Sequence, residues 1–260
     1  MPFWAFKDVV KEYLEKVNEN EKVRTHMPPP LNICPDSNHP PFQILEYTLF
    51  QPGLFLNYLA SPHKTSQYIT PLDTFIDIHN HRAIIIKGHE DAILTLTTTQ
   101  DIAAVVTHAV SYNGEWPKVG GIRGNRVTIS QILKIGEKLR GRYIHPSPLP
   151  IPKTQHNTNT HPYSHNTPPT GHPFTIALVT LPDLQAGNLN TPWTLAARHP
   201  SFTDAEADHL TAILKTVLIG TLLSSQKGAW DVSDEWNQRL PEYKFTEIEA
   251  FLAEVWEGRP

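Results

Sequence analysis

The sequence of 260 residues contains a single cysteine, Cys34, which lies in a polar, proline-rich segment. One cysteine excludes an intramolecular disulfide and a zinc site built from cysteines. Such sparse use of cysteine is typical of proteins from a reducing compartment. Because a nucleophilic cysteine needs an ordered, electropositive environment, we interpret Cys34 as an incidental loop thiol.

Neither sign of charge dominates, since 22 Lys and Arg stand against 26 Asp and Glu and give a formal net charge of −4. Without a sustained basic stripe, the sequence offers no field suited to nucleic acid or an anionic membrane. No apolar run approaches the roughly 20 residues that cross a bilayer, and the amino terminus lacks the features of a secretory signal. We therefore expect a cytoplasmic protein that binds a small molecule rather than nucleic acid or a membrane.

Hydrophobic residues make up 39% of the chain, which is enough for one sizeable core or two small ones and excludes wholesale disorder. Two stretches differ from the rest. Residues 23–43 contain clustered prolines that forbid a helix or a central strand. Residues 146–175 are rich in His, Asn, Thr and Pro and have almost nothing to bury. We expect a proline-rich insertion at the first and a disordered insertion at the second.

Apolar periodicity predicts a first helix over FKDVVKEYLEKV that needs a core to cover one face. A strand within residues 44–51 must end at Pro52-Gly53, and further strands are predicted at residues 83–88 and 92–99. The last strand runs directly into a buried helix. The predicted buried positions are Val9, Val10, Tyr13, Leu14 and Val17 in the first helix and Ile102, Val105, Val106, Ala109 and Val110 in the later one.

Three capping boxes predict helix starts, because a Ser or Thr oxygen and a Glu or Gln three residues later satisfy free N–H groups reciprocally. The helix that begins at Thr128 should end at Gly141, and the helix that begins at Thr246 should end at Gly258. The boxes pair Thr128 with Gln131, Thr203 with Glu206 and Thr246 with Glu249, and the last helix should bury Ile248, Phe251, Leu252, Val255 and Trp256.

The segment WPKVGGIRGNRVTISQIL places Gly120, Gly121 and Gly124 ahead of an amphipathic run, as a phosphate-binding loop would. A dinucleotide fingerprint requires a strand before G-x-G-x-x-G and its last glycine in the first turn of the helix. Here the glycines follow the turn-like NGEWPK, and residues 125–127 separate them from the Thr128 cap. We interpret the segment as a structural turn between the Asp101 helix and the Thr128 helix.

Other patterns give little chemistry. His79 and His81 in HNH have no third residue at metal-ligand spacing, so we predict no metal site. The chain has no G-x-S-x-G elbow for Ser-His-Asp catalysis. The adjacent Asp234 and Glu235 are interpreted as solvated charges at a helix end.

Five segments, in their order and spacing, resemble fungal NmrA-like proteins of the isoflavone-reductase-like group, which are atypical relatives of the short-chain dehydrogenases/reductases. No single motif is diagnostic, and the match covers residues 6–17, 44–142 and 226–258. The segments are Lys7 with VVKEYL, LEYTLFQPGLFLNYL, TTTQDIAAVVTHAV, EWPKVGGIRGNRVTISQILKIGEKLRG and GAWDVSDEWNQRLPEYKFTEIEAFLAEVW.

The resemblance implies NADPH-dependent reduction of a small, aromatic substrate. The helix that carries Lys7 is similar to the one that supplies the general acid/base lysine of reductase members, so Lys7 is the catalytic candidate. The turn after the strand implies that Gln51, Pro52, Gly53 and Phe55 lie at the edge of the NADP nicotinamide. Tyr58 is the substrate-binding candidate, although Phe55 and Tyr58 are equally compatible with plain core aromatics.

The implied fold class is α/β: the C-terminal portion of a Rossmann-type NAD(P)-binding fold plus a smaller α/β substrate domain. The first βαβ units and the glycine-rich pyrophosphate loop would precede residue 3 and are missing, which leaves the cofactor site incomplete. We divide the chain into a residual Rossmann portion (residues 1–59), a substrate-side α/β region (60–145), the disordered insertion (146–175) and a C-terminal helical region (176–260).

Two further hypotheses follow from these departures. Relatives pass almost directly from the first helix to the strand, and Val-Arg and Phe-Gln codons fit splice sites, so residues 23–43 are a candidate retained intron. The missing strands would leave a sheet edge through which the chain self-associates. The alternative function is a non-catalytic regulatory or binding module, or a gene product without cofactor binding.

Overall fold

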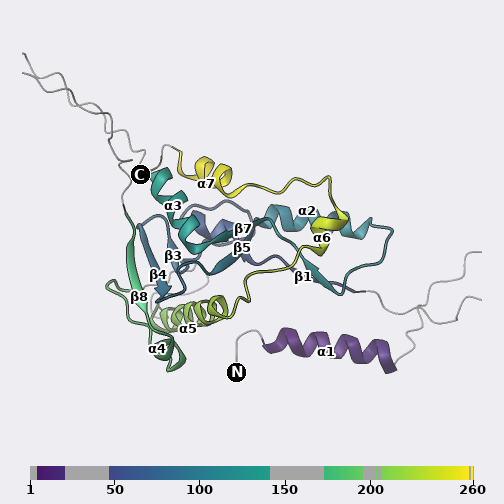
Figure 1. The fold of residues 1–260 in the computed structure, drawn as a ribbon, viewed down its shortest axis with the longest axis horizontal. Helices are drawn as coiled ribbons and strands as arrows, with labels where there is room; N and C mark the ends of the chain where they lie inside the picture. The colour runs from purple at the N-terminus through teal and green to yellow at the C-terminus, as the bar shows by residue number, and fades with distance from the viewer. Residues whose placement is uncertain are drawn as a thin grey trace, which may run out of the picture.

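The computed structural model describes residues 5–20, 47–140, 173–195, 203, 207–257 and 259. Within them the chain is a mixed α/β fold with parallel and mixed sheets, consistent with a partial Rossmann-like fold (Figure 1). The fold class expected from the sequence is therefore confirmed. The strands are β1 (Leu49–Gln51), β2 (Leu54–Phe55), β3 (Ile76–Asp77), β4 (Arg82–Ile86), β5 (Ile93–Thr97), β6 (Val119–Gly121), β7 (Asn125–Thr128) and β8 (Thr175–Val179).

The helices alternate with these strands along much of the chain. A short 3-10 helix, η1, follows β2 directly and spans Leu56–Ala60. The α-helices are α1 (Ala5–Asn20), α2 (Thr99–Val110), α3 (Ile129–Arg140), α4 (Leu181–Gln185), α5 (Ala207–Gln226), α6 (Glu235–Arg239) and α7 (Ile248–Trp256).

The strands form three small groups. β1 pairs in parallel with β6, and β5 lies between β2, in parallel, and β7, in antiparallel orientation. In the third group β4 lies between antiparallel β3 and parallel β8. β8 stands at the edge of this group, and its Ile176 and Leu178 side chains are 37% and 58% exposed. The expected self-association through a sheet edge stays a prediction.

The main core surrounds β4 and β5. Ala83, Ile84, Ile85 and Ile86 of β4 are all buried, which is the continuous apolar pattern of a strand covered on both faces. Figure 1 shows α3 and α7 on one side of the strands and α4 and α5 on the other. A smaller cluster joins α2 to the C-terminal segment around Trp236, which is fully buried.

Local signals predicted several elements correctly. β1 ends at Gln51, directly before Pro52, and the strands expected at residues 83–88 and 92–99 are β4 and β5. The Thr128 box is confirmed in both directions: Thr128 N–H donates to Gln131 Oε1 at 2.8 Å, and Gln131 N–H donates to Thr128 Oγ1 at 3.2 Å. In α7 the expected buried positions are buried, apart from the half-buried Phe251.

Two predicted apolar faces are wrong in part. In α1, Val9, Val10 and Tyr13 are 64%, 48% and 66% exposed. In α2, Val110 is 73% exposed, although Val105 and Ala109 are fully buried. Amphipathic spacing is enough to form a helix, but burial also requires a partner element opposite each apolar residue. Val110 is the last residue of α2, and no core neighbour faces it within the described part of the chain.

The predicted box at Thr246 is also wrong. The Thr246 hydroxyl donates to Asp101 Oδ1 at 3.2 Å, and the Glu249 carboxylate accepts from Lys138 Nζ at 3.1 Å. Instead Asn125 caps α7, because its Oδ1 accepts from Ile248 N–H at 2.9 Å. A distant side chain thus replaces the local cap.

Several predictions fall outside the described residues: the Thr203–Glu206 box, the Gly141 and Gly258 helix ends, the proline-rich insertion and nearly all of the low-complexity insertion. β8 is a strand that we did not predict, and the domain boundaries stay predictions. By length and composition alone α5, with 20 residues and a mean hydropathy of 1.2, could cross a membrane, where we expected no such run. Core helices of soluble proteins pass the same test, and Leu218, Leu222 and Ser225 of α5 are buried.

Candidate functional site

The candidate site is the turn from Gln51 to Tyr58, which follows the carboxyl end of β1. Gln51 is exposed, and its carbonyl oxygen accepts from Ile122 N–H at 2.9 Å, which ties it to the segment after β6. β1 and β6 are parallel, so both end at the same edge. In open α/β sheets, ligands bind in the crevice outside the carboxyl ends of the strands. The sequence-predicted residues lie at such an edge, and their role in binding a ligand stays a prediction.

Gly53 makes the turn possible. Its φ angle is +73°, and a Cβ atom at this position would lie 2.2 Å from the carbonyl oxygen of Thr95. Only glycine fits, because any Cβ atom would overlap the Thr95 carbonyl group. The close approach of the two backbones lets the chain pair with β5 through Leu54 and Phe55 immediately after the turn. Gly53 thus serves backbone geometry, and it sets the direction in which the following aromatic residues leave the sheet.

Phe55 and Tyr58 are partners across this turn. Both side chains are half-buried, and their ring centroids are 5.6 Å apart at an interplanar angle of 33°. Burial raises the pKa of the Tyr58 phenol above its usual range. The hydroxyl therefore stays protonated at neutral pH and can donate a hydrogen bond beside an apolar ring.

Asn57 holds the turn in place, and sequence reasoning missed it. The side chain is 3% exposed, and its Oδ1 accepts from Thr99 N–H at 2.9 Å at the start of α2. Its Nδ2 donates to Thr65 Oγ1 at 3.0 Å and Gln100 Oε1 at 3.1 Å. The signal that could have revealed it is a lone amide inside the apolar run LFLNYL, because a buried amide requires several partners.

Lys7, the catalytic candidate, lies in α1. Its side chain is outside the described residues, so its distance to the turn is untested and its role stays a prediction.

The glycines of residues 120–124 do not form a phosphate cradle. Gly120 and Gly121 belong to strand β6 and not to a turn, which corrects our interpretation of the segment. A Cβ atom on Gly120 would meet Thr48 Oγ1 at 2.3 Å, and one on Gly121 would meet the Ser233 carbonyl oxygen at 2.2 Å. Protein atoms fill the space that a phosphate would need. As predicted, the segment joins α2 to α3 and its glycines serve backbone geometry.

At the starts of four described helices, a protein side chain already accepts from one of the N–H groups that a pyrophosphate would use. Thr98 caps α2, Thr180 caps α4 and Asn125 caps α7. The Thr128 box caps α3. A dinucleotide phosphate needs uncapped N–H groups at a helix start, so these residues do not fit that part of NADP.

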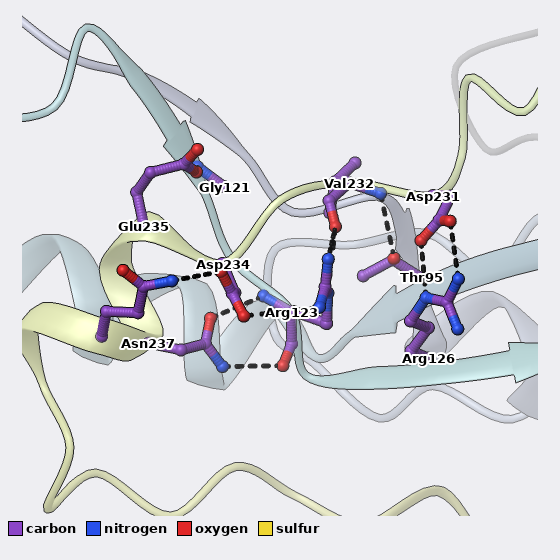
Figure 2. Close-up of polar contacts among 10 residues, drawn as sticks. Thr95, Gly121, Arg123, Arg126, Asp231, Val232, Asp234, Glu235 and Asn237 are labelled. Carbon is purple, nitrogen blue, oxygen red and sulfur yellow. Dashed lines mark hydrogen bonds and ion pairs between the residues drawn. The ribbon is translucent and has the colours of Figure 1, made fainter.

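A C-terminal strap, residues 230–239, makes polar contacts with β5, β6 and β7 (Figure 2). Arg123 donates to the Val232 carbonyl oxygen from Nε at 3.0 Å and from Nη2 at 2.8 Å, and it lies 3.4 Å from Asp234 Oδ2. Asn237 completes a two-way contact, because its Oδ1 accepts from Arg123 N–H and its Nδ2 donates to Arg123 O, both at 2.8 Å.

We interpreted Asp234 and Glu235 of the strap as solvated charges, and their contacts correct this interpretation. Asp234 pairs with Arg123, and Glu235 Oε2 accepts from Gly121 N–H at 2.9 Å. Burial would raise the pKa of Glu235, but hydrogen bonds from Ser233, its own backbone and Gly121 bring it below the usual range. Asp231 makes two 2.8 Å contacts with Arg126, and these hydrogen bonds lower the pKa of its carboxyl.

Asp101, the first-turn residue of α2, anchors the chain beyond the strap. It is 3% exposed and accepts from Thr98 Oγ1 at 2.7 Å, Tyr243 Oη at 2.8 Å and Thr246 N–H at 3.2 Å. Burial, with the hydrogen bond and charge of Asp101, raises the pKa of Tyr243 to about 12. Since its partners satisfy the carboxylate, this network is structural. Among the described residues no group of three His, Cys, Asp or Glu side chains could hold a metal ion.

The fold is that of a partial Rossmann-like α/β protein, and the turn lies at the carboxyl end of a parallel strand pair. The chain is 32% identical over 100 residues to Oxidoreductase swnN of Metarhizium robertsii (strain ARSEF 23 / ATCC MYA-3075). The matched region covers 38% of this chain and 29% of that protein. The match thus spans less than a third of the fungal relative, and it supports a relationship to oxidoreductases in general. No family model and no solved structure matches the chain.

Proposed function

We propose that the chain provides the substrate side of an NADP-dependent oxidoreductase of the NmrA-like, isoflavone-reductase-like group, which reduces a small aromatic substrate. The observation that carries the proposal is the position of residues 51–58 at the carboxyl end of β1. The similarity to a fungal protein named as an oxidoreductase supports the reaction class.

In this proposal the turn meets the nicotinamide end of the cofactor. Gln51, Pro52, Gly53 and Phe55 form the cofactor edge, where NADPH would supply a hydride to the substrate. Tyr58 binds the substrate, because its half-buried ring can stack on a planar aromatic molecule while its neutral hydroxyl donates to an oxygen. The phosphates do not fit the glycines and helix starts described above. They require a strand, glycine-rich loop and helix that the described residues do not form.

Lys7 is proposed to transfer the proton that accompanies reduction. A positioned general acid or base contributes roughly 10²–10⁴ to a rate. Replacing the Lys7 side chain should therefore lower turnover and leave cofactor binding intact.

A chimaera tests this proposal directly. The amino-terminal half of an NmrA-like reductase, which carries the glycine-rich loop, is joined ahead of the full chain. We expect NADPH oxidation at 340 nm with small aromatic carbonyl compounds, and we expect Lys7→Ala to lower kcat by about 10²-fold or more. Tyr58→Phe, which removes only the hydroxyl, should mainly raise KM.

The matched control is Lys11→Ala, one turn along α1. It should leave kcat unchanged. If Lys7→Ala and Lys11→Ala behave alike in a folded, NADPH-binding chimaera, Lys7 has no catalytic role. A chimaera that binds NADPH and aromatic ligands without turnover would instead favour a non-catalytic binding module.

A further inference from the structure

Three nitrogen-bearing side chains from three parts of the chain meet around a fourth, Trp256, near the end of α7. His63 follows η1, His79 lies between β3 and β4, and Arg140 is the last residue of α3. The ring centroids of His63 and His79 lie 4.9 and 6.0 Å from that of Trp256, and the Arg140 guanidinium carbon lies 4.7 Å from it. These four residues form the Trp256 cluster.

Each member of the Trp256 cluster has a buried nitrogen without a hydrogen-bond partner: Trp256 Nε1, His63 Nε2, His79 Nδ1 and Arg140 Nε. Trp256 itself is 5% exposed. Buried polar groups are as a rule paired, because an unmade hydrogen bond costs the full loss of hydration. The indole Nε1 and guanidinium Nε can only donate, so these two N–H groups lack an acceptor among the described residues.

The charge around the cluster is positive. Burial, then the charges of Arg259, His79 and Arg140, lower the pKa of His63, and burial lowers the pKa of Arg140. No carboxylate of the described residues forms an ion pair with Arg140. The other two terminal nitrogens of Arg140 donate to backbone oxygens, of His79 at 3.3 Å and of Arg259 at 3.2 Å. These contacts fix the guanidinium but leave its charge uncompensated.

We propose that the Trp256 cluster binds an oxyanion, a phosphate or carboxylate group. The donor set favours an anion over a metal, because indole and guanidinium groups donate hydrogen bonds and do not coordinate cations. His63, His79 and Arg140 are half-buried, so the cluster lies at the margin of the core. The cluster is built from other elements than β1 and β2, and the proposal is independent of the reductase function.

The indole N–H of Trp256 is the reporter. We propose a titration of the full chain with inorganic phosphate, followed by ¹H–¹⁵N spectra, with the Trp256 signal assigned from Trp256→Phe. The expected result is a saturable shift of this signal. Arg140→Gln should raise the phosphate Kd about tenfold or more, because it removes a charge-assisted hydrogen bond, and His63→Gln should raise it by less, because it removes a neutral imidazole. Arg140→Lys should restore part of the affinity.

Two matched variants separate binding from loss of structure. Arg239→Gln also removes an arginine that donates to two carbonyl oxygens, and His209→Gln removes an exposed histidine of α5. Both should retain the phosphate Kd. Parallel titrations with acetate and adenosine monophosphate distinguish a carboxylate, free phosphate and nucleotide as the source. A shift that does not saturate, that sodium chloride reproduces at equal ionic strength, or that the control variants lose equally would overturn the proposal.

Discussion

At the scale of single residues, two asparagine side chains and one glycine fix the backbone in and around the candidate site. Asn57 holds the turn to α2, and Asn125 caps α7 from a strand more than a hundred positions away. Gly53 has no side chain where one would overlap the Thr95 carbonyl group. Gly53 and Asn57 belong to the turn that carries Phe55 and Tyr58.

Gly53→Ala should therefore destabilise the fold. Its Cβ atom would lie 2.2 Å from Thr95 O, in addition to the strain of a φ of +73°. Gly88→Ala is the matched control, since Gly88 has a φ of +84° and nothing within 4 Å of its Cβ position. We expect Gly88→Ala to cost about 1–2 kcal/mol and Gly53→Ala a further 1–3 kcal/mol, measured by urea unfolding. Equal losses would show that the close approach to β5 contributes nothing.

The structural role of a residue could be predicted where the sequence signal is local. The Thr128 box is correct because both of its residues lie in one helical turn. Thr246 has the same spacing, but the buried carboxylate of Asp101 takes its hydroxyl. Nothing near Thr246 in the sequence reports that carboxylate, because 145 positions separate the two residues.

At the scale of elements, the strap joins the C-terminal segment to β5, β6 and β7. Sequence patterns predicted several strands and helices but could not predict this contact, because no periodicity links Arg123 to Val232 or Arg126 to Asp231. The same limit explains α1, whose amphipathic pattern predicted a helix but not the exposure of Val9 and Tyr13. Burial depends on which elements meet, and that is not a local property.

The strap should weaken in acid. Hydrogen bonds from Arg126 lower the pKa of Asp231 below its usual value of 3.8, so the ion pair stabilises the folded chain above that value. This stability is lost as the pH falls through the lowered pKa. Asp231→Asn should thus reduce the free energy of unfolding at pH 7, and the difference from the natural chain should shrink below pH 4 or so.

Glu249→Gln is the control for this prediction. The Lys138–Glu249 pair is 58% and 62% exposed, so solvent screens it and its loss should change stability by roughly 0–1 kcal/mol at most. Urea unfolding at several pH values measures both variants. An Asp231→Asn effect that is constant from pH 7 to about pH 3 would contradict the role of the ion pair.

At the scale of the whole molecule, a partial Rossmann-like α/β body carries the turn that we propose for the nicotinamide end of a cofactor, and its described residues form no cradle for the phosphates. The fold class was predictable from the resemblance of five segments to a known family, and the local strand and helix signals agree with it. The contacts that occupy the space beside Gly120 and Gly121 could not be predicted. They come from Thr48 and Ser233, and they depend on how distant segments pack against β6.

The most direct test of this account is a titration with NADPH, followed by nicotinamide fluorescence, of the full 260-residue chain beside the chimaera described above. We predict no saturable micromolar binding by the chain alone and saturable micromolar binding by the chimaera, weakened by Phe55→Ala. Micromolar binding of NADPH by the chain alone would contradict the central claim, because it would show that these residues form a complete cofactor site.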